Sequence, residues 1–145
     1  MRMQAVLMMV ALCAVAGCSA PSSSPEPTTQ APPPPASPSG PPQIVSLSPS
    51  NGAMDVSPGT VQAVVTFDQP MGGGMSFTTR GGPDKYPEMV GQPVWSADKL
   101  TITATMQLGA NRQYVIGLNS PNHKNFKNER GIALNPVIWE FTTGN

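Results

Sequence analysis

Residues 61–67 read VQAVVTF, and this stretch decides the fold class. Every second side chain is apolar, so an extended chain would gather these side chains on one face. Valine, threonine and phenylalanine also favour extended structure. Pro70 follows closely and cannot donate a hydrogen bond to a neighbouring strand. The stretch therefore predicts a β-strand with one buried face, formed by Val61, Ala63, Val65 and Phe67.

Short extended stretches recur along the chain on both sides of this strand. Turn-forming residues separate them, among them SPSNG at 48–52, GGG at 72–74 and SADK at 96–99. No segment of helical length repeats its apolar residues with a period of 3.6. Residues 43–145 are therefore predicted to be all-β, an antiparallel β-sandwich of about seven strands. The other expected strands are residues 43–47, 75–79, 92–95, 100–106, 113–118 and 138–142.

Residues 1–17 have the composition of a secretory signal peptide. Arg2 supplies a basic start, and the apolar run that follows is shorter than the roughly 20 residues a membrane-spanning helix needs. Residues 15–18, VAGC, resemble the lipobox of bacterial lipoproteins. The resemblance implies cleavage before Cys18 and attachment of a diacylglycerol to its thiol. The alternative is an ordinary signal peptide followed by a cysteine that occurs by chance.

Lipidation of Cys18 would hold the mature protein on the outer side of a bacterial membrane, in the cell envelope. Ser19, where aspartate would favour inner-membrane retention, directs the protein to the outer membrane if the bacterium has two membranes. Cys13 lies in the segment that is removed. The mature domain is therefore expected to contain no disulfide, although its compartment would allow one.

Residues 18–42 consist of this cysteine and a segment rich in proline and serine. Glu26 is its single charge, and it contains no aliphatic residue larger than alanine. Such a segment cannot bury enough apolar surface to offset its ordering entropy, so it is predicted to be a disordered stalk. Polyproline II geometry would give it a reach of roughly 75 Å. The alternative is a ligand for a proline-recognising domain.

Four motifs along the predicted sandwich carry a family resemblance. In chain order they are residues 48–56 (SPSNGAMDV), 65–71 (VTFDQPM), 108–114 (LGANRQY) and 128–143, which begins NERG and ends WEFTT. With these motifs, residues 43–144 resemble the bacterial Ig-like domains of the surface-layer SbsA type. The resemblance implies an Ig-like β-sandwich that serves cohesion, spacing or binding rather than catalysis. Tyr114 is placed like the tyrosine corner of such sandwiches.

The residue inventory gives no support for an enzyme. His123 is the single histidine, the carboxylates are scattered over predicted turns, and neither a nucleophile elbow nor a zinc-binding His pair occurs. Eight basic and eight acidic residues balance, so no strong field favours nucleic acid. We expect a non-enzymatic envelope module for binding or structural presentation, with no catalytic residue, metal or cofactor.

The loop at 119–131 is the most informative candidate for ligand binding. It joins the last two predicted strands at one end of the sandwich, where binding loops usually lie. Its basic and aromatic residues favour a glycan, a cell-wall polymer or an acidic protein patch. The alternative is a solvated loop with its phenylalanine tucked into the domain. The candidate contacts are His123, Lys124, Phe126, Lys127 and Arg130.

A second function is kept open by the abundance of methionine. The CopC-type periplasmic copper carriers are also small sandwiches with a similar opening motif, and thioethers together with one imidazole suit Cu(I). Those carriers, however, use a histidine at the mature N-terminus, where this chain has Cys18. One domain on one stalk predicts a monomer, whose expected partners are the membrane, through Cys18, and an unknown envelope protein or glycan. The methionines concerned are Met54, Met71, Met75, Met89 and Met106.

Overall fold

The computed structural model describes residues 38–145. The predicted signal peptide, Cys18 and most of the predicted stalk lie outside these residues. Within the described part, no helix combines the length and apolar character needed to cross a bilayer. Residues 40–42 already belong to the folded body, because Pro42 is fully buried and the Gly40 carbonyl accepts a hydrogen bond from Gln69 Nε2 at 3.3 Å.

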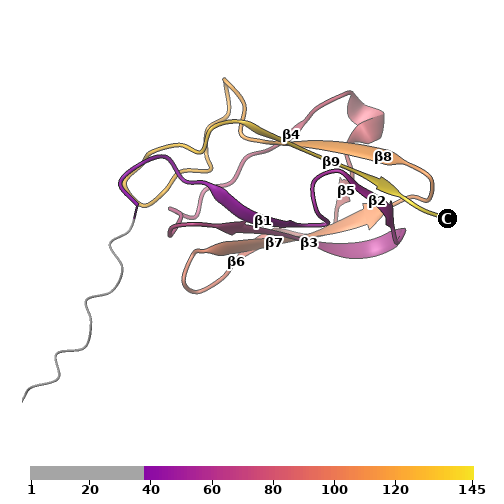
Figure 1. Ribbon diagram of the computed structural model, residues 1–145, viewed down its shortest axis with the longest axis horizontal. Helices are drawn as coiled ribbons and strands as arrows, with labels where there is room; N and C mark the ends of the chain where they lie inside the picture. The colour runs from indigo at the N-terminus through magenta and orange to yellow at the C-terminus, as the bar shows by residue number, and fades with distance from the viewer. Residues whose placement is uncertain (1–37) are drawn as a thin grey trace, which may run out of the picture. The chain divides into compact units, whose positions relative to one another are not determined.

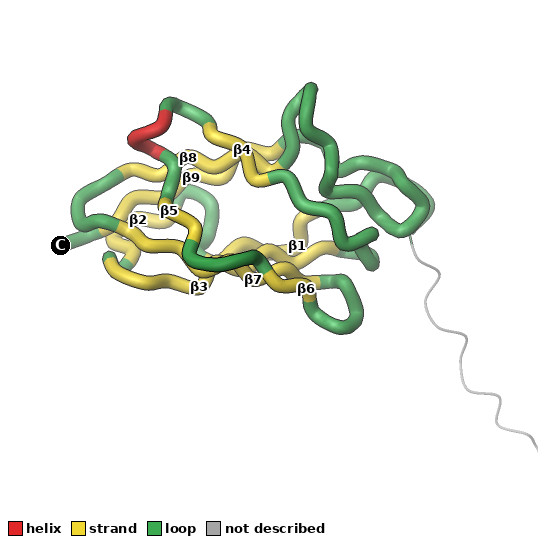
Figure 2. The backbone as a smooth tube through the Cα atoms, turned by 180° about the vertical axis from the view of Figure 1, so that it is seen from behind, coloured by secondary structure: helices red, strands yellow, loops and turns green. Residues whose placement is uncertain are grey.

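The described residues form two β-sheets packed face to face (Figures 1 and 2). Sheet A has the strand order β1-β3-β7-β5, and β6 also pairs with β7; sheet B has the order β2-β9-β8-β4. A single 3₁₀ turn, η1 (Pro83–Lys85), follows β4. The strands are β1 (Ile44–Ser48), β2 (Ala53–Val56), β3 (Gly59–Phe67), β4 (Phe77–Thr79), β5 (Glu88–Met89), β6 (Val94–Trp95), β7 (Thr101–Leu108), β8 (Gln113–Leu118) and β9 (Val137–Thr143).

β3, the strand from whose alternation the fold class was predicted, lies in the interior of sheet A. β3 lies between β1 and β7, and its register with β7 places Ala63 opposite Ala104 and Val65 opposite Ile102. All four of these side chains are almost completely buried. The all-β sandwich predicted from alternation is therefore confirmed. Each of the seven predicted strands is present, β8 with the predicted bounds and the other six with shifted ends.

Two further strands were not predicted, and one of them changes the topology. β2 pairs with β9 in parallel, with Ala53 opposite Phe141 and Val56 opposite Thr143. Asp55 between them has a φ of 60°, so the strand is irregular and its side chains do not alternate. We had expected a wholly antiparallel sandwich, and the parallel pairing of β2 with β9 shows that this part of the prediction was wrong. β5, the other strand that was not predicted, comprises only Glu88 and Met89.

The predicted tyrosine corner is present at the turn between β7 and β8. The Gly109 N–H donates to the Tyr114 hydroxyl oxygen at 2.7 Å, and the Tyr114 ring packs on Phe141 with centroids 5.6 Å apart. Trp139 is likewise fully buried, and its Nε1–H donates to the Pro49 carbonyl at 2.8 Å. These contacts tie the ends of sheet B to neighbouring turns.

The glycine-rich segment at 72–74 lies where the chain crosses from β3 in sheet A to β4 in sheet B. It passes against the loop that follows β8. A Cβ atom at Gly74 would lie 2.6 Å from the Asn125 carbonyl oxygen, so glycine is required there. This close approach places β4 beside the loop in which the candidate ligand contacts were predicted.

Candidate functional site

The loop between β8 and β9, residues 119–136, is organised around Asn119. This residue has a φ of 62° and is completely buried. Its side-chain amide donates to the carbonyls of Phe126 at 3.0 Å and Leu134 at 2.9 Å, and its Oδ1 accepts from the Phe126 N–H at 3.0 Å. Asparagine tolerates the left-handed conformation and satisfies three backbone groups at once. The loop therefore has a fixed shape.

Phe126 does not face a ligand. Its side chain is fully buried between the sheets, with ring centroids 5.2 Å from Phe77, 5.7 Å from Phe67 and 6.1 Å from Trp95. Of the two roles considered for this residue, the structure supports the one in which the ring is tucked into the domain. The physical reason is that a phenylalanine flanked by polar residues still gains most by leaving water. Phe126 is thereby removed from the predicted ligand contacts.

Asn128 fixes the second half of the same loop. Its Oδ1 accepts from the backbone N–H groups of Arg130 at 3.1 Å and Ile132 at 2.8 Å, and its Nδ2 donates to Gln69 Oε1 at 3.0 Å. Gln69 in turn donates to the Gly40 carbonyl. Asn119 and Asn128 thus use their side-chain hydrogen bonds within the domain.

The basic residues of the loop are exposed but do not converge on one site. His123 is held by Ser120, whose Oγ lies 3.3 Å from His123 Nδ1 and accepts from the His123 N–H at 3.0 Å. His123, Lys127 and Arg130 line three different surface depressions. Lys124 lies between His123 and Lys127 in the chain and is also exposed.

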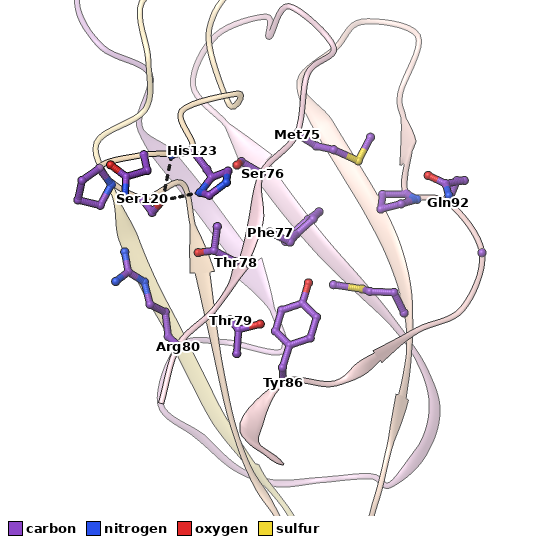
Figure 3. A pocket seen from close by; sticks show the side chains of 15 residues that line it. Met75, Ser76, Phe77, Thr78, Thr79, Arg80, Tyr86, Gln92, Ser120 and His123 are labelled. Atoms are coloured by element: carbon purple, nitrogen blue, oxygen red, sulfur yellow. Dashed lines mark hydrogen bonds between the residues drawn. The ribbon is translucent and has the colours of Figure 1, made fainter. Parts of the chain in front are cut away.

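A surface depression with a volume of about 890 Å³ runs along β4 (Figure 3). We call it the β4 groove. One wall is the continuous segment from Met75 to Arg80, and the other holds Tyr86, Met89 and residues 91–93; residues 120–123 close one end. Sequence reasoning placed His123 in a candidate site but missed both walls. They come from edge strands of different sheets, and no local sequence pattern joins them.

The two sides of β4 in this groove differ chemically. Met75, Phe77 and Tyr86 lie on one side, whereas Arg80 and His123 lie on the other (Figure 3). Burial raises the pKa of the Tyr86 phenol further above the neutral range. Arg80 Nε is buried without a hydrogen-bond partner. The lining of the groove contains two basic side chains, Arg80 and His123, and no carboxylate.

The methionines considered for copper are divided among separate places. Met71 and Met106 are buried in the core, and Met54 is 75 % exposed on β2. Met75 and Met89 line the β4 groove together with His123. Within residues 38–145, no group of three or more His, Cys, Asp or Glu side chains is placed to hold a metal ion.

The predicted role of the loop's basic residues has a direct test. Replacing Lys124, Lys127 and Arg130 together with glutamine removes three positive charges and leaves Asn119 and Phe126 in place. We expect an envelope partner captured by in-cell crosslinking of the full-length protein to be lost from this triple variant, with the thermal unfolding temperature as the check on folding. A partner retained at wild-type yield would exclude these three residues as ligand contacts.

The paired sheets, the tyrosine corner and the ordered end loops define an Ig-like β-sandwich. The model of the bacterial Ig-like domain matches residues 38–143, and the chain belongs to this family. Domains of the family occur in bacterial surface proteins and are generally non-enzymatic. A comparison with curated proteins found no match.

Proposed function

We propose that this protein is a lipid-anchored module of the bacterial cell envelope, which presents its Ig-like domain outside the membrane for binding or structural purposes. The observation that carries the proposal is the sequence VAGC at 15–18 between a short apolar segment and a Pro/Ser-rich segment. A lipoprotein cysteine carries two or three acyl chains. Each buried CH₂ group contributes about 0.8 kcal/mol, and more than one chain is needed for stable attachment.

The way the chain joins the domain supports a tethered arrangement. Pro42 is buried, the Gln43 N–H donates to Asp68 Oδ1 at 2.8 Å, and the Asp68 N–H donates to the Gln43 carbonyl at 3.1 Å. The first strand therefore begins immediately after a fixed junction. Any N-terminal segment would connect to a rigid body, which suits a domain held at a distance from its anchor.

Replacing Cys18 with serine tests the anchor. We expect the wild-type protein in the membrane fraction of a bacterial host and the Cys18→Ser variant in the soluble extracytoplasmic fraction or retained as a precursor. Metabolic labelling with radioactive palmitate should mark the wild type alone. In a host with two membranes, density-gradient separation should place the wild type in the outer membrane, because Ser19 follows the cysteine.

Cys13→Ser is the matched control, since it removes the other cysteine of the chain and leaves VAGC intact. This variant should be labelled and membrane-bound like the wild type. Palmitate labelling that persists in Cys18→Ser, or that depends on Cys13, would contradict the proposal.

A further inference from the structure

β4 is the outermost strand of sheet B and has one unpaired edge. It pairs with β8 alone, with Thr78 opposite Gly117. Just before the strand, the Ser76 carbonyl accepts from the Asn119 N–H at 2.9 Å. Backbone groups alternate between the two edges of an antiparallel strand, so the groups of Thr78 point toward β8. The N–H and C=O groups of Phe77 and Thr79 therefore point away from the sheet.

The other sheet edges carry features that hinder pairing with another strand. β1 has an irregular register between Ile44 and Ser46, and β2 is irregular around Asp55. β5 and β6, which share the far edge of sheet A, are separated by residues 90–93, of which Pro93 lacks an N–H. Bulges and prolines are the usual protection of edge strands. β4 contains neither.

The β4 groove follows this unprotected edge. Six consecutive residues, from Met75 to Arg80, all line it. Side chains of neighbouring residues in a strand point to opposite faces, so a depression lined by all three residues of β4 lies along the strand's edge and not on one face. Its length and position suit an extended chain lying beside β4.

The two faces of β4 determine which side chains an extended peptide bound beside this strand would need. Phe77 points inward, toward Phe126, Tyr86 and Met89, which form an apolar surface. Thr78 and Arg80 point outward over β8, where a Cβ atom at Gly117 would lie 3.0 Å from Arg80 Cγ. Arg80 has a buried Nε without a partner, and the groove lining offers it no carboxylate. The outward face is thus complementary to negative charge.

We propose that the free edge of β4 binds an extended segment of a partner protein as an added strand, in which apolar residues alternate with acidic ones. The apolar residues enter the groove beside Phe77, and the acidic residues lie beside Thr78 and Arg80. Main-chain hydrogen bonds to Phe77 and Thr79 supply the pairing, and the alternation supplies the specificity. The chain's own segment at 19–37 is a poor occupant, because its many prolines cannot donate such bonds.

The test uses an array of ten-residue peptides and the full-length protein in detergent. One alternate set of positions carries Val, Leu, Phe or Tyr, and the other carries Asp or Glu; a matched array replaces the acids with Lys or Arg. We expect binding to the acidic array at least tenfold tighter than to the basic array. Arg80→Gln should reduce this preference to less than threefold.

Thr79→Pro tests the strand pairing itself. It removes the N–H that points away from β8 and leaves the bonds between Thr78 and Gly117, so the sheet is retained. We expect peptide binding to fall at least tenfold in Thr79→Pro and to stay within twofold in Thr79→Ala, which changes the same side chain but keeps the N–H. Circular dichroism checks that both variants fold.

Amide hydrogen exchange gives a measurement that needs no substitution. The amides of Phe77 and Thr79 should exchange quickly in the free protein and at least tenfold more slowly with a bound acidic-array peptide. Equal binding to both arrays, unchanged binding in Thr79→Pro, or unprotected Phe77 and Thr79 amides would each overturn the proposal. So would protection that rises with protein concentration alone, because the edge would then pair with a second copy of the chain.

Discussion

Replacing Phe126 with alanine is expected to lower the free energy of unfolding by about 3–5 kcal/mol. The ring is fully buried and contacts Phe67, Phe77 and Trp95, so its removal leaves a cavity between the two sheets. A domain of this size is stabilised by only about 5–15 kcal/mol, so the variant loses a large share of its stability. Equilibrium denaturation in urea, monitored by tryptophan fluorescence, measures the change.

Lys124→Ala, in the same loop but exposed, is the matched control and should change stability by less than about 0.5 kcal/mol. A loss below about 1 kcal/mol in Phe126→Ala would mean that the ring is not part of the core. The positions described here for the basic residues of the loop would then be wrong as well, because the burial of Phe126 holds the segment that carries them.

Asn119→Ala is expected to destabilise the domain by about 3–5 kcal/mol, since each buried backbone group left without a partner costs about 1–3 kcal/mol. Two such groups lose their partner, the Phe126 N–H and the Leu134 carbonyl, whereas the Phe126 carbonyl still accepts from the Leu134 N–H at 2.8 Å. Alanine also tolerates the positive φ poorly. The measurement is the urea midpoint, together with the exchange rate of the Phe126 amide, which should rise.

Asn119→Gly separates the two causes. Glycine accepts the positive φ but makes none of the side-chain hydrogen bonds, so this variant should still lose about 2 kcal/mol or more. Asn122→Ala, exposed in the same loop, should behave like the wild type. Wild-type stability in Asn119→Gly would show that the hydrogen bonds of Asn119 make no net contribution.

The fold could be predicted from the sequence wherever an apolar period extended over five or more residues. β3, β7 and β9 have regular burial patterns, in which inward side chains such as Val65, Ile102 and Phe141 recur at every second position. Alternation reports burial directly in such strands. β2 escaped detection because the positive φ of Asp55 breaks its alternation, and its parallel pairing with β9 has no local sequence signature.

The candidate site could be predicted less well, because it depends on contacts between distant segments. A phenylalanine in a polar loop is compatible with a surface or a buried role, and Phe126 is buried through contact with residues from three other segments. The β4 groove likewise joins Thr79 and Met89, which belong to edge strands of different sheets. Only His123 was both predicted as a ligand contact and found in the groove.

The hydrogen bonds that connect Gly40, Gln69 and Asn128 have a mechanical consequence. The two ends of the described chain lie at opposite ends of the sandwich (Figure 1). Tension applied between them would run roughly along the strands, and the ladder between β1 and β3 would be loaded in shear. In shear the bonds of a ladder resist together, whereas in peeling they break one after another. The connection through Gln69 also transmits part of the force to the loop that holds Phe126.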